Sequence, residues 1–336
     1  MRLNINLEKS SYDIVIKRNV IADSLEYIKS VYTNKNIYIV TDSNVEKLYL
    51  DTLVKALENY YDVQSVVFDA GEENKNIDTY QYICEELINK GVRRDTLLIG
   101  LGGGVVLDMC GFVSATLYRG LNYINIPTTL LSMVDSSIGG KTGIDFLNRK
   151  NVLGAFKQPL LVLIDPSTLS TLDRREYASG MAELIKHAII GDEKLWNALK
   201  NKEELTEEMI YNSLCVKKNV VEQDELDMGQ RMILNFGHTF GHVLELKYGY
   251  KHGEAVALGM LMAISYGIDL GYTNPIIYDE LKSMLKLYCL PTNEYSYEDY
   301  INEIVNDKKN IAGIINFILI SEIGKIKVVK LDENKI

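Results

Sequence analysis

The sequence is poor in cysteine and has no concentrated run of positive charge. Its four cysteines, Cys84, Cys110, Cys215 and Cys289, are widely spaced and form no C-x-x-C pair. This usage favours reduced thiols in a cytosol over a secreted disulfide scaffold. Lysine and arginine total 36 against 46 aspartates and glutamates, a formal net charge of −10. Nucleic acid is therefore not expected as a partner.

Long apolar runs are missing as well. The segment 1–8 alternates as a strand does and lacks the apolar stretch of a signal peptide. No later run approaches the length that a membrane span needs. We therefore expect a cytoplasmic protein with no membrane partner.

The pattern changes midway along the 336 residues, a length that favours two domains. In the first half, short β-branched runs alternate with helical patterns, which predicts a mostly parallel, Rossmann-like α/β sheet. Strands are expected at 37–40, 63–68, 96–101, 123–126 and 160–164. After Asp165-Pro166, amphipathic segments predict helices at 176–190, 205–222, 238–247 and 253–270, and a small hairpin is expected at 314–320 and 325–329. We expect an α/β domain over 1–165, a mainly α-helical domain over 166–336, and the active site in the cleft between them.

A glycine-rich loop follows the strand expected at 96–101. Gly102-Gly103-Gly104 leads into a helix-like segment, and its bare amides suit a pyrophosphate. The G-x-G-x-x-G pattern is incomplete, because Val105 stands where its third glycine is required. Asp42 ends an earlier strand and is well placed to accept hydrogen bonds from a ribose. These residues alone leave two interpretations open, a nucleotide cofactor site and a tight turn capped by Asp42.

A second loop, Gly139-Gly140-Lys141-Thr142-Gly143, has some features of an ATP-binding P-loop. Asp135 stands where the first glycine of that motif is required, and the preceding segment 129–134 looks helical rather than extended. ATP is therefore disfavoured. The remaining interpretation is a flexible turn that presents Lys141, and nearby Lys150 and Asn151, to an anion; the alternative is a solvated loop.

Three of the four histidines, His238, His242 and His252, fall within fifteen residues. If 231–242 formed one continuous helix, Arg231, Asn235, His238 and His242 would share one polar stripe, although Gly237 can instead mark a helix start. Spacing alone selects His238 and His242 as joint metal ligands.

Imidazole and carboxylate ligands suit zinc, and an open catalytic site needs three protein ligands. The candidate carboxylate is Glu183, which lies on an apolar helical segment where an unpaired charge is costly. The alternative for Glu183 is a local pair with Lys186 or His187. The H-E-x-x-H motif is absent, so a zinc protease is not indicated.

Taken together, these segments resemble the 3-dehydroquinate synthase family, which belongs to the sugar-phosphate cyclases. The stretches that carry the resemblance are 102–108 with Gly111-Phe112, 126–131, 134–137, 139–143, 154–156, 180–183, 235–242 and 252–256. The resemblance implies a lyase of the shikimate pathway, which supplies aromatic amino acids. It converts 3-deoxy-D-arabino-heptulosonate 7-phosphate to 3-dehydroquinate and phosphate through transient oxidation by NAD, phosphate elimination, re-reduction and intramolecular aldol closure.

The resemblance also assigns roles to residues. It implies NAD binding by Asp42, Asn44, Glu72, Lys75, Gly103, Gly104, Val105, Asp108, Thr128, Thr129, Leu131, Asp135, Lys141, Lys150, Asn151 and Thr171. It implies substrate binding by Arg119, Asp135, Lys141, Asn151, Lys186, Lys217, Arg231, Asn235, His242 and Lys308, with Lys309 as the alternative to Lys308, and catalytic roles for Asp135, Lys141, Lys186 and His242. The metal, Zn²⁺ with Co²⁺ as an alternative, is assigned to Glu183, His238 and His252, which moves His242 to the substrate.

The same resemblance places Arg119 in the active site of a neighbouring subunit and so implies a homodimer.

Leu107 departs from the family, which usually has a glycine there. Either Leu107 points away from the cofactor, or the local backbone differs from that of the family.

Three alternative functions share parts of these motifs: another sugar-phosphate cyclase, a metal-dependent NAD polyol dehydrogenase, and a scaffold with a decayed site. The pair Lys217 and Arg231 suits a substrate carboxylate, which argues against a cyclase of neutral-ended sugar phosphates. Net release of NADH would identify a dehydrogenase.

Overall fold

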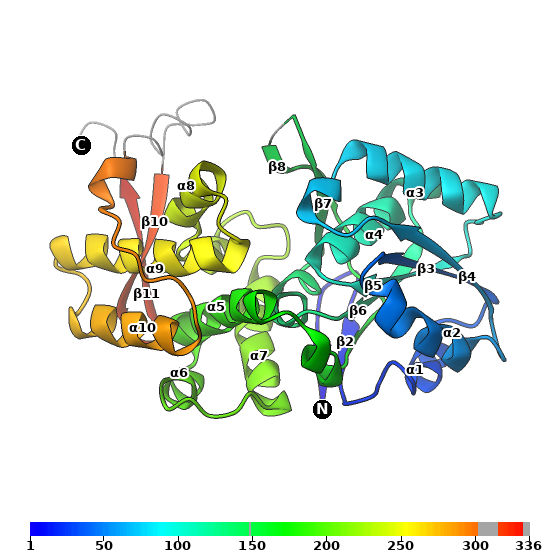
Figure 1. Cartoon of the computed structure of the whole chain (residues 1–336), viewed down its shortest axis with the longest axis horizontal. Helices are drawn as coiled ribbons and strands as arrows, with labels where there is room; N and C mark the ends of the chain where they lie inside the picture. Colours follow the sequence, from blue (N-terminus) through cyan, green and yellow to red (C-terminus); the bar gives the residue numbers. More distant parts are fainter. Residues whose placement is uncertain (148, 302–314, 332–336) are drawn as a thin grey trace. The chain divides into compact units, whose positions relative to one another are not determined.

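The computed structural model describes residues 1–147, 149–301 and 315–331. The chain forms two compact units, Met1–Leu172 and Asp173–Ile336 (Figure 1). The sequence had placed this division after residue 165. The predicted substrate contact Lys308 and its alternative Lys309 lie outside the described residues. Within the described part of the chain, no helix combines the length and apolar character needed to cross a membrane.

The first unit is built on a seven-stranded sheet in the order β1-β2-β9-β6-β5-β3-β4. The pair β1–β2 is antiparallel and the other pairs are parallel. The strands are β1 (Arg2–Ile5), β2 (Tyr12–Ile16), β3 (Asn36–Asp42), β4 (Asp62–Phe68), β5 (Leu97–Gly102), β6 (Asn122–Pro127) and β9 (Leu161–Ile164). The predicted mostly parallel sheet is confirmed, and each of its five expected strands is present. The strand β2 was not predicted.

Each face of this sheet has its own apolar layer, because successive side chains of a strand point to opposite faces. Ile37 and Ile39 of β3 pack in one layer with residues of α1 (Ser24–Val31) and α2 (Asp51–Leu57). Tyr38 and Val40 pack in the other layer with residues of α3 (Ile77–Asn89) and α4 (Gly104–Thr116). Figure 1 shows the two helix pairs on opposite sides of the sheet. Burial on both faces explains the continuous apolar runs of the central strands.

A separate hairpin of β7 (Lys141–Phe146) and β8 (Arg149–Phe156) belongs to the same unit. Of the flexible turn predicted here, the structure has a turn conformation at Gly139 and Gly140, which have φ of 92° and 69° and are buried. The loop interpretation is wrong from Lys141 onward, because the chain there pairs with β8. Gly143 allows close pairing, since a Cβ on it would lie 2.7 Å from the carbonyl oxygen of Leu153.

The second unit is mainly helical, as predicted. Its helices are α5 (Arg174–Gly191), α6 (Glu193–Lys200), α7 (Glu207–Gln223), α8 (His238–Tyr248), α9 (His252–Asp269) and α10 (Ile276–Leu287), with a hairpin of β10 (Ile315–Glu322) and β11 (Lys325–Leu331). The four predicted helices and the hairpin are confirmed, whereas α6 and α10 were not predicted. The buried helix α9 packs against α5, α8, α10 and β10.

The continuous helix considered for 231–242 is not present. A short 3₁₀ segment, η6 (Gln230–Asn235), ends before Gly237, and α8 starts at His238. Gly237 has a φ of 80°, a left-handed conformation that glycine adopts without strain and that interrupts a right-handed helix. Arg231 and Asn235 therefore do not continue the helical stripe of His238 and His242.

Helices α8 and α9 cross at unusually close range, with little room for side chains between their backbones. A Cβ on Gly259 of α9 would lie 1.9 Å from the carbonyl oxygen of Gly237 and 2.7 Å from the backbone nitrogen of Gly241. A Cβ on Gly241 would in turn lie 2.9 Å from the carbonyl oxygen of Ala255. The crossing therefore requires glycine on both helices.

We predict that Gly259→Ala lowers the free energy of unfolding by about 3 kcal/mol, at the upper end of the usual cost of overpacking. Helix propensity alone would have the opposite sign and favour alanine by about 1 kcal/mol. Denaturant unfolding of the purified variant measures the difference. The control is Ser265→Ala on the same helix, which adds no atom and should change stability by less than about 0.5 kcal/mol. An unchanged or increased stability of Gly259→Ala would show that the close crossing is not obligatory.

Candidate functional site

Three helices of the second unit bring Glu183, His238 and His252 together. His238 is the first residue of α8 and His252 is the first residue of α9. The start of α9 lies directly on α5: the backbone N–H of Gly253 donates to Ser179 Oγ at 3.0 Å, and a Cβ on Gly253 would be 2.1 Å from the Ser179 carbonyl oxygen. Ser179 is one helical turn before Glu183, so the same face of α5 meets both contacts.

The carboxylate of Glu183 faces both imidazoles. Its Oε1 lies 3.7 Å from His238 Nε2 and 3.5 Å from His252 Nε2. A tetrahedral ion with ligand atoms about 2.1 Å away holds those atoms about 3.4 Å apart. The observed spacing is thus close to that of three ligands around one zinc-sized ion, and the nitrogen and oxygen donors are those that zinc and cobalt accept.

The two oxygens of Glu183 differ in their contacts, and this bears on both interpretations of the residue, a metal ligand and a local ion pair. Glu183 is completely buried, and its Oε2 forms a local ion pair with Lys186 Nζ. Its Oε1 is buried and accepts no hydrogen bond from the described residues. A buried carboxylate oxygen without a donor is costly unless a cation completes its contacts, so this atom fits a metal ligand.

The orientation of the two imidazoles agrees with the same role. His238 Nδ1 lies 3.3 Å from the carbonyl oxygen of Phe236, and His252 Nδ1 lies 3.6 Å from Glu245 Oε2. In each ring an acceptor faces Nδ1, while Nε2 is directed at Glu183. This is the usual arrangement of metal-binding histidines, whose second nitrogen donates to a carbonyl or a carboxylate.

The charge states of these groups follow from their burial and neighbours. Burial raises the pKa of Glu183, but Lys186 and the two imidazoles lower it, and the resulting pKa lies well below its usual range. Burial and the Lys186 cation lower the pKa of His238 well below its usual range. Burial lowers the pKa of His252, but Glu183 and Glu245 raise it to about 9. Glu183 is therefore ionised and His238 neutral at pH 7, while His252 must release a proton before it can bind a metal.

His242 belongs to the same cluster but is solvent-exposed. One ring nitrogen from each of His238, His242 and His252 lies within 4.8 Å of the other two. The centroid of the His242 ring lies 5.4 Å from that of His238 and 6.4 Å from that of His252. Proximity therefore allows a three-histidine set as well as the set with Glu183. The contacts of Glu183 with His238 and His252 favour the latter.

Two buried cations occur on neighbouring elements of the second unit. Lys217 of α7 is 5% exposed and Arg231 of η6 is 3% exposed, and these two elements pack together. Arg231 Nη1 donates to the carbonyl oxygen of Glu225 at 2.7 Å. Asn235, at the end of η6, is exposed. The two residues predicted to contact a substrate carboxylate are thus both buried cations on elements that pack together.

Part of the predicted nucleotide-binding set lies at the carboxyl ends of β5 and β6 in the first unit. Gly103 precedes the first turn of α4, and a Cβ on Gly103 would lie 3.1 Å from Thr129 Cγ2. The backbone N–H of Thr128 donates to the carbonyl oxygen of Gly102 at 3.0 Å. The first backbone N–H groups of a helix have no intrahelical acceptor, so Gly104 and Val105 offer donors to an anion at this edge.

Asp42 ends β3, the strand next to β5. Its Oδ1 accepts hydrogen bonds from the backbone N–H groups of Asn44 and Val45, each at 2.9 Å. The capped turn that we considered as an alternative is therefore present. It also holds the Asp42 carboxylate at the same edge of the sheet as the glycine loop.

A polar network joins five further predicted cofactor residues. The buried Lys75 Nζ lies 2.6 Å from Asp108 Oδ2 and donates to Asn151 Oδ1 at 2.5 Å. Lys150 Nζ lies 3.6 Å from Glu72 Oε1. Burial lowers the pKa of Lys75, but the neighbouring carboxylates of Asp108 and Glu72 raise it above its usual value. Lys75 is therefore a cation that fixes the end of the hairpin at Asn151 relative to α4.

Arg119 is exposed and lies in an unusual backbone segment. Tyr118, Arg119 and Gly120 have φ of 52°, 66° and 125°, three consecutive positive values. Left-handed backbone is unfavourable for the two non-glycine residues, and such strain is often associated with function.

Leu107, the departure from the family pattern, is buried in the first unit. Its side chain is directed at Gly100 of β5, where an added Cβ would lie 3.3 Å from Leu107 Cδ2.

The remaining predicted residues of the first unit lie on short elements. Leu131 immediately precedes η4 (Ser132–Ser136), which contains Asp135, and Lys141 is the exposed first residue of β7. Thr171, on η5 (Pro166–Thr171), contacts the hydroxyl of Tyr49. The helical character expected for 129–134 agrees with η4.

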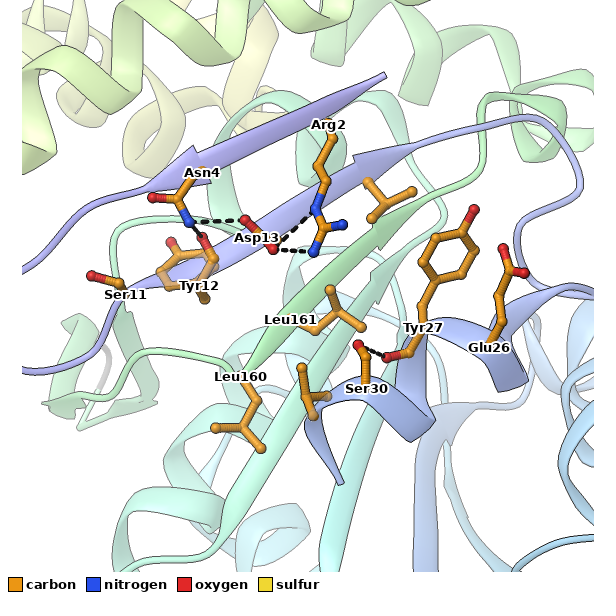
Figure 2. A pocket seen from close by; sticks show the side chains of 12 residues that line it. Arg2, Asn4, Ser11, Tyr12, Asp13, Glu26, Tyr27, Ser30, Leu160 and Leu161 are labelled. Atoms are coloured by element: carbon orange, nitrogen blue, oxygen red, sulfur yellow. Dashed lines mark hydrogen bonds and ion pairs between the residues drawn. The ribbon is translucent and has the colours of Figure 1, made fainter. Parts of the chain in front are cut away.

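A pocket of about 380 Å³ in the first unit does not include the predicted residues (Figure 2). It lies between β1, β2, β9 and α1, and its polar groups largely bond one another. Asp13 accepts hydrogen bonds from Arg2 Nε at 3.0 Å and from Asn4 Nδ2 at 2.8 Å. These internal pairs leave this pocket without an evident chemical role.

Sequence reasoning missed one residue of the histidine cluster, Glu245, which is 8% exposed. Glu245 lies seven residues after His238 and three after His242, spacings that place all three on one face of α8. A carboxylate on the histidine face of a helix was therefore the available signal.

Comparison with known proteins identifies the family of the chain. Residues 65–179 match the family described as 3-dehydroquinate synthase N-terminal, and residues 180–310 match 3-dehydroquinate synthase C-terminal. The chain is 40% identical over 341 residues to the 3-dehydroquinate synthase of Clostridium kluyveri, covering 98% of this chain and 95% of that one. It is 40% identical over 348 residues to that of Enterococcus faecalis strain OG1RF, covering 100% and 97%.

Solved structures show the same fold. A 2-deoxy-scyllo-inosose synthase complexed with carbaglucose-6-phosphate, NAD⁺ and Co²⁺ has a TM-score of 0.87 at 23% identity, covering 99% of this chain and 97% of that one. A 2-epi-5-epi-valiolone synthase from Streptomyces hygroscopicus with NAD⁺ and Zn²⁺ bound has a TM-score of 0.87 at 27% identity, covering 96% and 94%. An iron-containing alcohol dehydrogenase from Thermotoga maritima is more distant, with a TM-score of 0.66 at 19% identity, covering 89% and 90%. With both family models matched and full-length identity of 40%, the chain belongs to the 3-dehydroquinate synthase family.

Proposed function

We propose that this protein converts 3-deoxy-D-arabino-heptulosonate 7-phosphate to 3-dehydroquinate and phosphate, with NAD and a divalent metal ion as cofactors. The observation that carries the proposal is the 40% identity to 3-dehydroquinate synthases over 98% of the chain. A cytoplasmic location is part of the proposal, and the wide spacing of the four cysteines supports it.

Glu183, His238 and His252 would hold the metal ion. The proposed ion is Zn²⁺, with Co²⁺ as an alternative. When bound, the ion would supply a Lewis acid that polarises a substrate hydroxyl or carbonyl oxygen. The chain contributes an ionised carboxylate, kept so by Lys186, and two imidazoles with Nε2 directed at it. Lys186, which pairs with Glu183, is a cation adjacent to this ligand set.

The glycine loop and its neighbours would hold NAD, which accepts and later returns a hydride when bound. The amides of Gly104 and Val105 at the start of α4 would bind the pyrophosphate, and Asp42 a ribose hydroxyl. Lys75 would keep this part of the site rigid through its pair with Asp108. Hydride transfer requires that the NAD-binding residues and the metal ligands act on the same substrate molecule.

The substrate has two anionic ends, and the proposed contacts divide between them. Lys217 and Arg231 would bind the carboxylate, where two buried cations offset its loss of hydration. Asn151, His242 and Arg119 would bind the phosphate. We infer that the departing phosphate itself accepts the neighbouring carbon-bound proton, so that the chain needs few dedicated acid–base groups.

A homodimer is part of the proposal, with Arg119 serving the site of the other subunit. Tyr118, next to Arg119, has an exposed side chain. The β7–β8 hairpin also exposes large apolar side chains, those of Phe146, Leu147, Val152 and Phe156. Four exposed apolar side chains on one hairpin support an interface with a second copy at this hairpin. Sedimentation as a monomer at micromolar concentration would contradict this arrangement.

The activity is tested directly by supplying 3-deoxy-D-arabino-heptulosonate 7-phosphate, catalytic NAD and zinc. We expect stoichiometric release of phosphate without net accumulation of NADH, because NAD is regenerated in each turnover. Net NADH would instead indicate a dehydrogenase. A folded, metal-loaded preparation that releases no phosphate would reject the proposed activity.

The metal assignment predicts opposite outcomes for two histidines of one cluster. His252→Ala should lose bound zinc and activity, because it removes a ligand. His242→Ala should keep zinc near one ion per chain and lose at least tenfold in activity, because its role is to bind substrate. Metal analysis after dialysis distinguishes them; zinc retained by His252→Ala, or lost equally by both variants, would overturn the assignment.

Arg231→Ala should raise the KM for the heptulosonate phosphate ten- to hundredfold, in line with about 1.5–3 kcal/mol for a hydrogen bond to a charged group. The Kd for NAD should stay within about twofold, because the predicted NAD contacts lie in the first unit. Steady-state kinetics and NAD titration measure the two quantities. The exposed Arg94→Ala is a control for loss of charge alone. Equal weakening of both ligands would contradict a carboxylate contact.

A further inference from the structure

Glu245 is a buried carboxylate for which the proposed reaction has no direct use. It lies on α8 and is 8% exposed, and its Oε2 is 3.6 Å from His252 Nδ1. Burying a carboxylate costs several kcal/mol unless a partner compensates the charge. Its position next to a metal-binding candidate therefore calls for a functional explanation.

The ring of His252 lies between two carboxylates, one at each nitrogen. Glu183 Oε1 is 3.5 Å from Nε2, and Glu245 Oε2 is 3.6 Å from Nδ1. Only one of these nitrogens can carry the proton when the imidazole is neutral. The proposed function assigns Glu183 to the metal ion, so the carboxylate that remains to hold the imidazole proton is Glu245, at Nδ1, and the Nε2 lone pair then faces Glu183.

The backbone fixes this relationship. Glu245 and His252 lie on α8 and α9, whose separation is set where Gly241 meets Ala255 and where Gly259 meets Gly237. His252 and Ala255 are three residues apart on α9, and Gly241 and Glu245 are four apart on α8, so both pairs lie on the faces that touch. The distance between the carboxylate and the ring is thus a property of the helix crossing.

We propose that Glu245 is a positioning residue for the metal centre: it accepts the Nδ1 proton of His252, selects the tautomer with Nε2 free, and holds the ring toward Glu183. The inference rests on the metal site of the proposed function and extends it. His238 receives the equivalent orientation from a neutral acceptor, the carbonyl of Phe236.

The test measures metal affinity instead of turnover. The metal-free full-length protein is titrated with Zn²⁺ in competition with a chromophoric chelator, and the visible absorption spectrum of the Co²⁺ form is recorded. Glu245→Ala should weaken the Kd for Zn²⁺ ten- to hundredfold and change the Co²⁺ spectrum, as expected when the outer partner of a histidine ligand is lost. Glu245→Gln, which keeps an acceptor oxygen without the charge, should show a smaller loss.

The matched controls are Glu280→Ala and Glu280→Gln, which remove a carboxylate of α10 that pairs with Lys200. Both should bind Zn²⁺ with the wild-type Kd. If Glu245→Ala does not fold, Glu245→Gln decides the question. A wild-type Kd and Co²⁺ spectrum for folded Glu245 variants, or an equal loss in the Glu280 variants, would overturn the positioning role.

These results separate the inference from the proposed function. If the wild-type protein binds zinc and releases phosphate, and the Glu245 variants bind zinc equally well, only the role of Glu245 is rejected. A wild-type protein that binds neither Zn²⁺ nor Co²⁺ rejects the metal site, and the role of Glu245 with it.

Discussion

The close backbone contact of α9 with α5 and α8 is the constraint on which the histidine cluster depends. Gly253 lets the start of α9 lie on Ser179 of α5, and Gly259 lets α9 lie on Gly237, the residue that precedes α8. Without these contacts, Glu183, His238 and His252 would come from three helices with no fixed separation. Packing at this range leaves no space for adjustment by side chains, because protein interiors are already close-packed. The geometry of the candidate metal centre is therefore a consequence of backbone packing.

Buried charge is compensated in the same way in both units. In the second unit Glu183 pairs with Lys186, and in the first unit Asp108 pairs with Lys75. Each pair combines a carboxylate and a lysine that are largely removed from solvent, so the loss of hydration is offset by the partner. Both pairs involve predicted site residues: Lys75 also donates to Asn151, and the partner of Lys186 is itself a predicted metal ligand. Such pairs add little to stability, but they keep charged groups in defined positions.

Much of the fold could be predicted from the sequence, because the relevant signals are local. β-branched runs predicted β3 to β6 and β9, and helical periodicity predicted α5, α7, α8 and α9. The β7–β8 hairpin was missed because its glycines suggested a loop, whereas Gly143 allows the two strands to pair closely.

The histidine cluster shows more clearly what a single sequence cannot predict. Spacing selected His238 and His242, since both lie on one helix, but His252 comes from another helix and Glu245 pairs with it across that boundary. Such partners are set by tertiary packing, which a single sequence does not reveal. The family resemblance supplied His252, but it did not supply Glu245.

Two of the three proposed ligands are the first residues of their helices. His238 opens α8 and His252 opens α9, so an ion held between them would also tie down two helix starts. Helix initiation is the unfavourable step in helix formation, and terminal turns fray more readily than interior ones. If these residues hold an ion, metal occupancy and local order would be thermodynamically linked in this unit: part of the binding free energy would be used to hold the first turns in place. The apparent affinity for the ion would then reflect how well those two turns are formed before it arrives, as well as the strength of the three bonds.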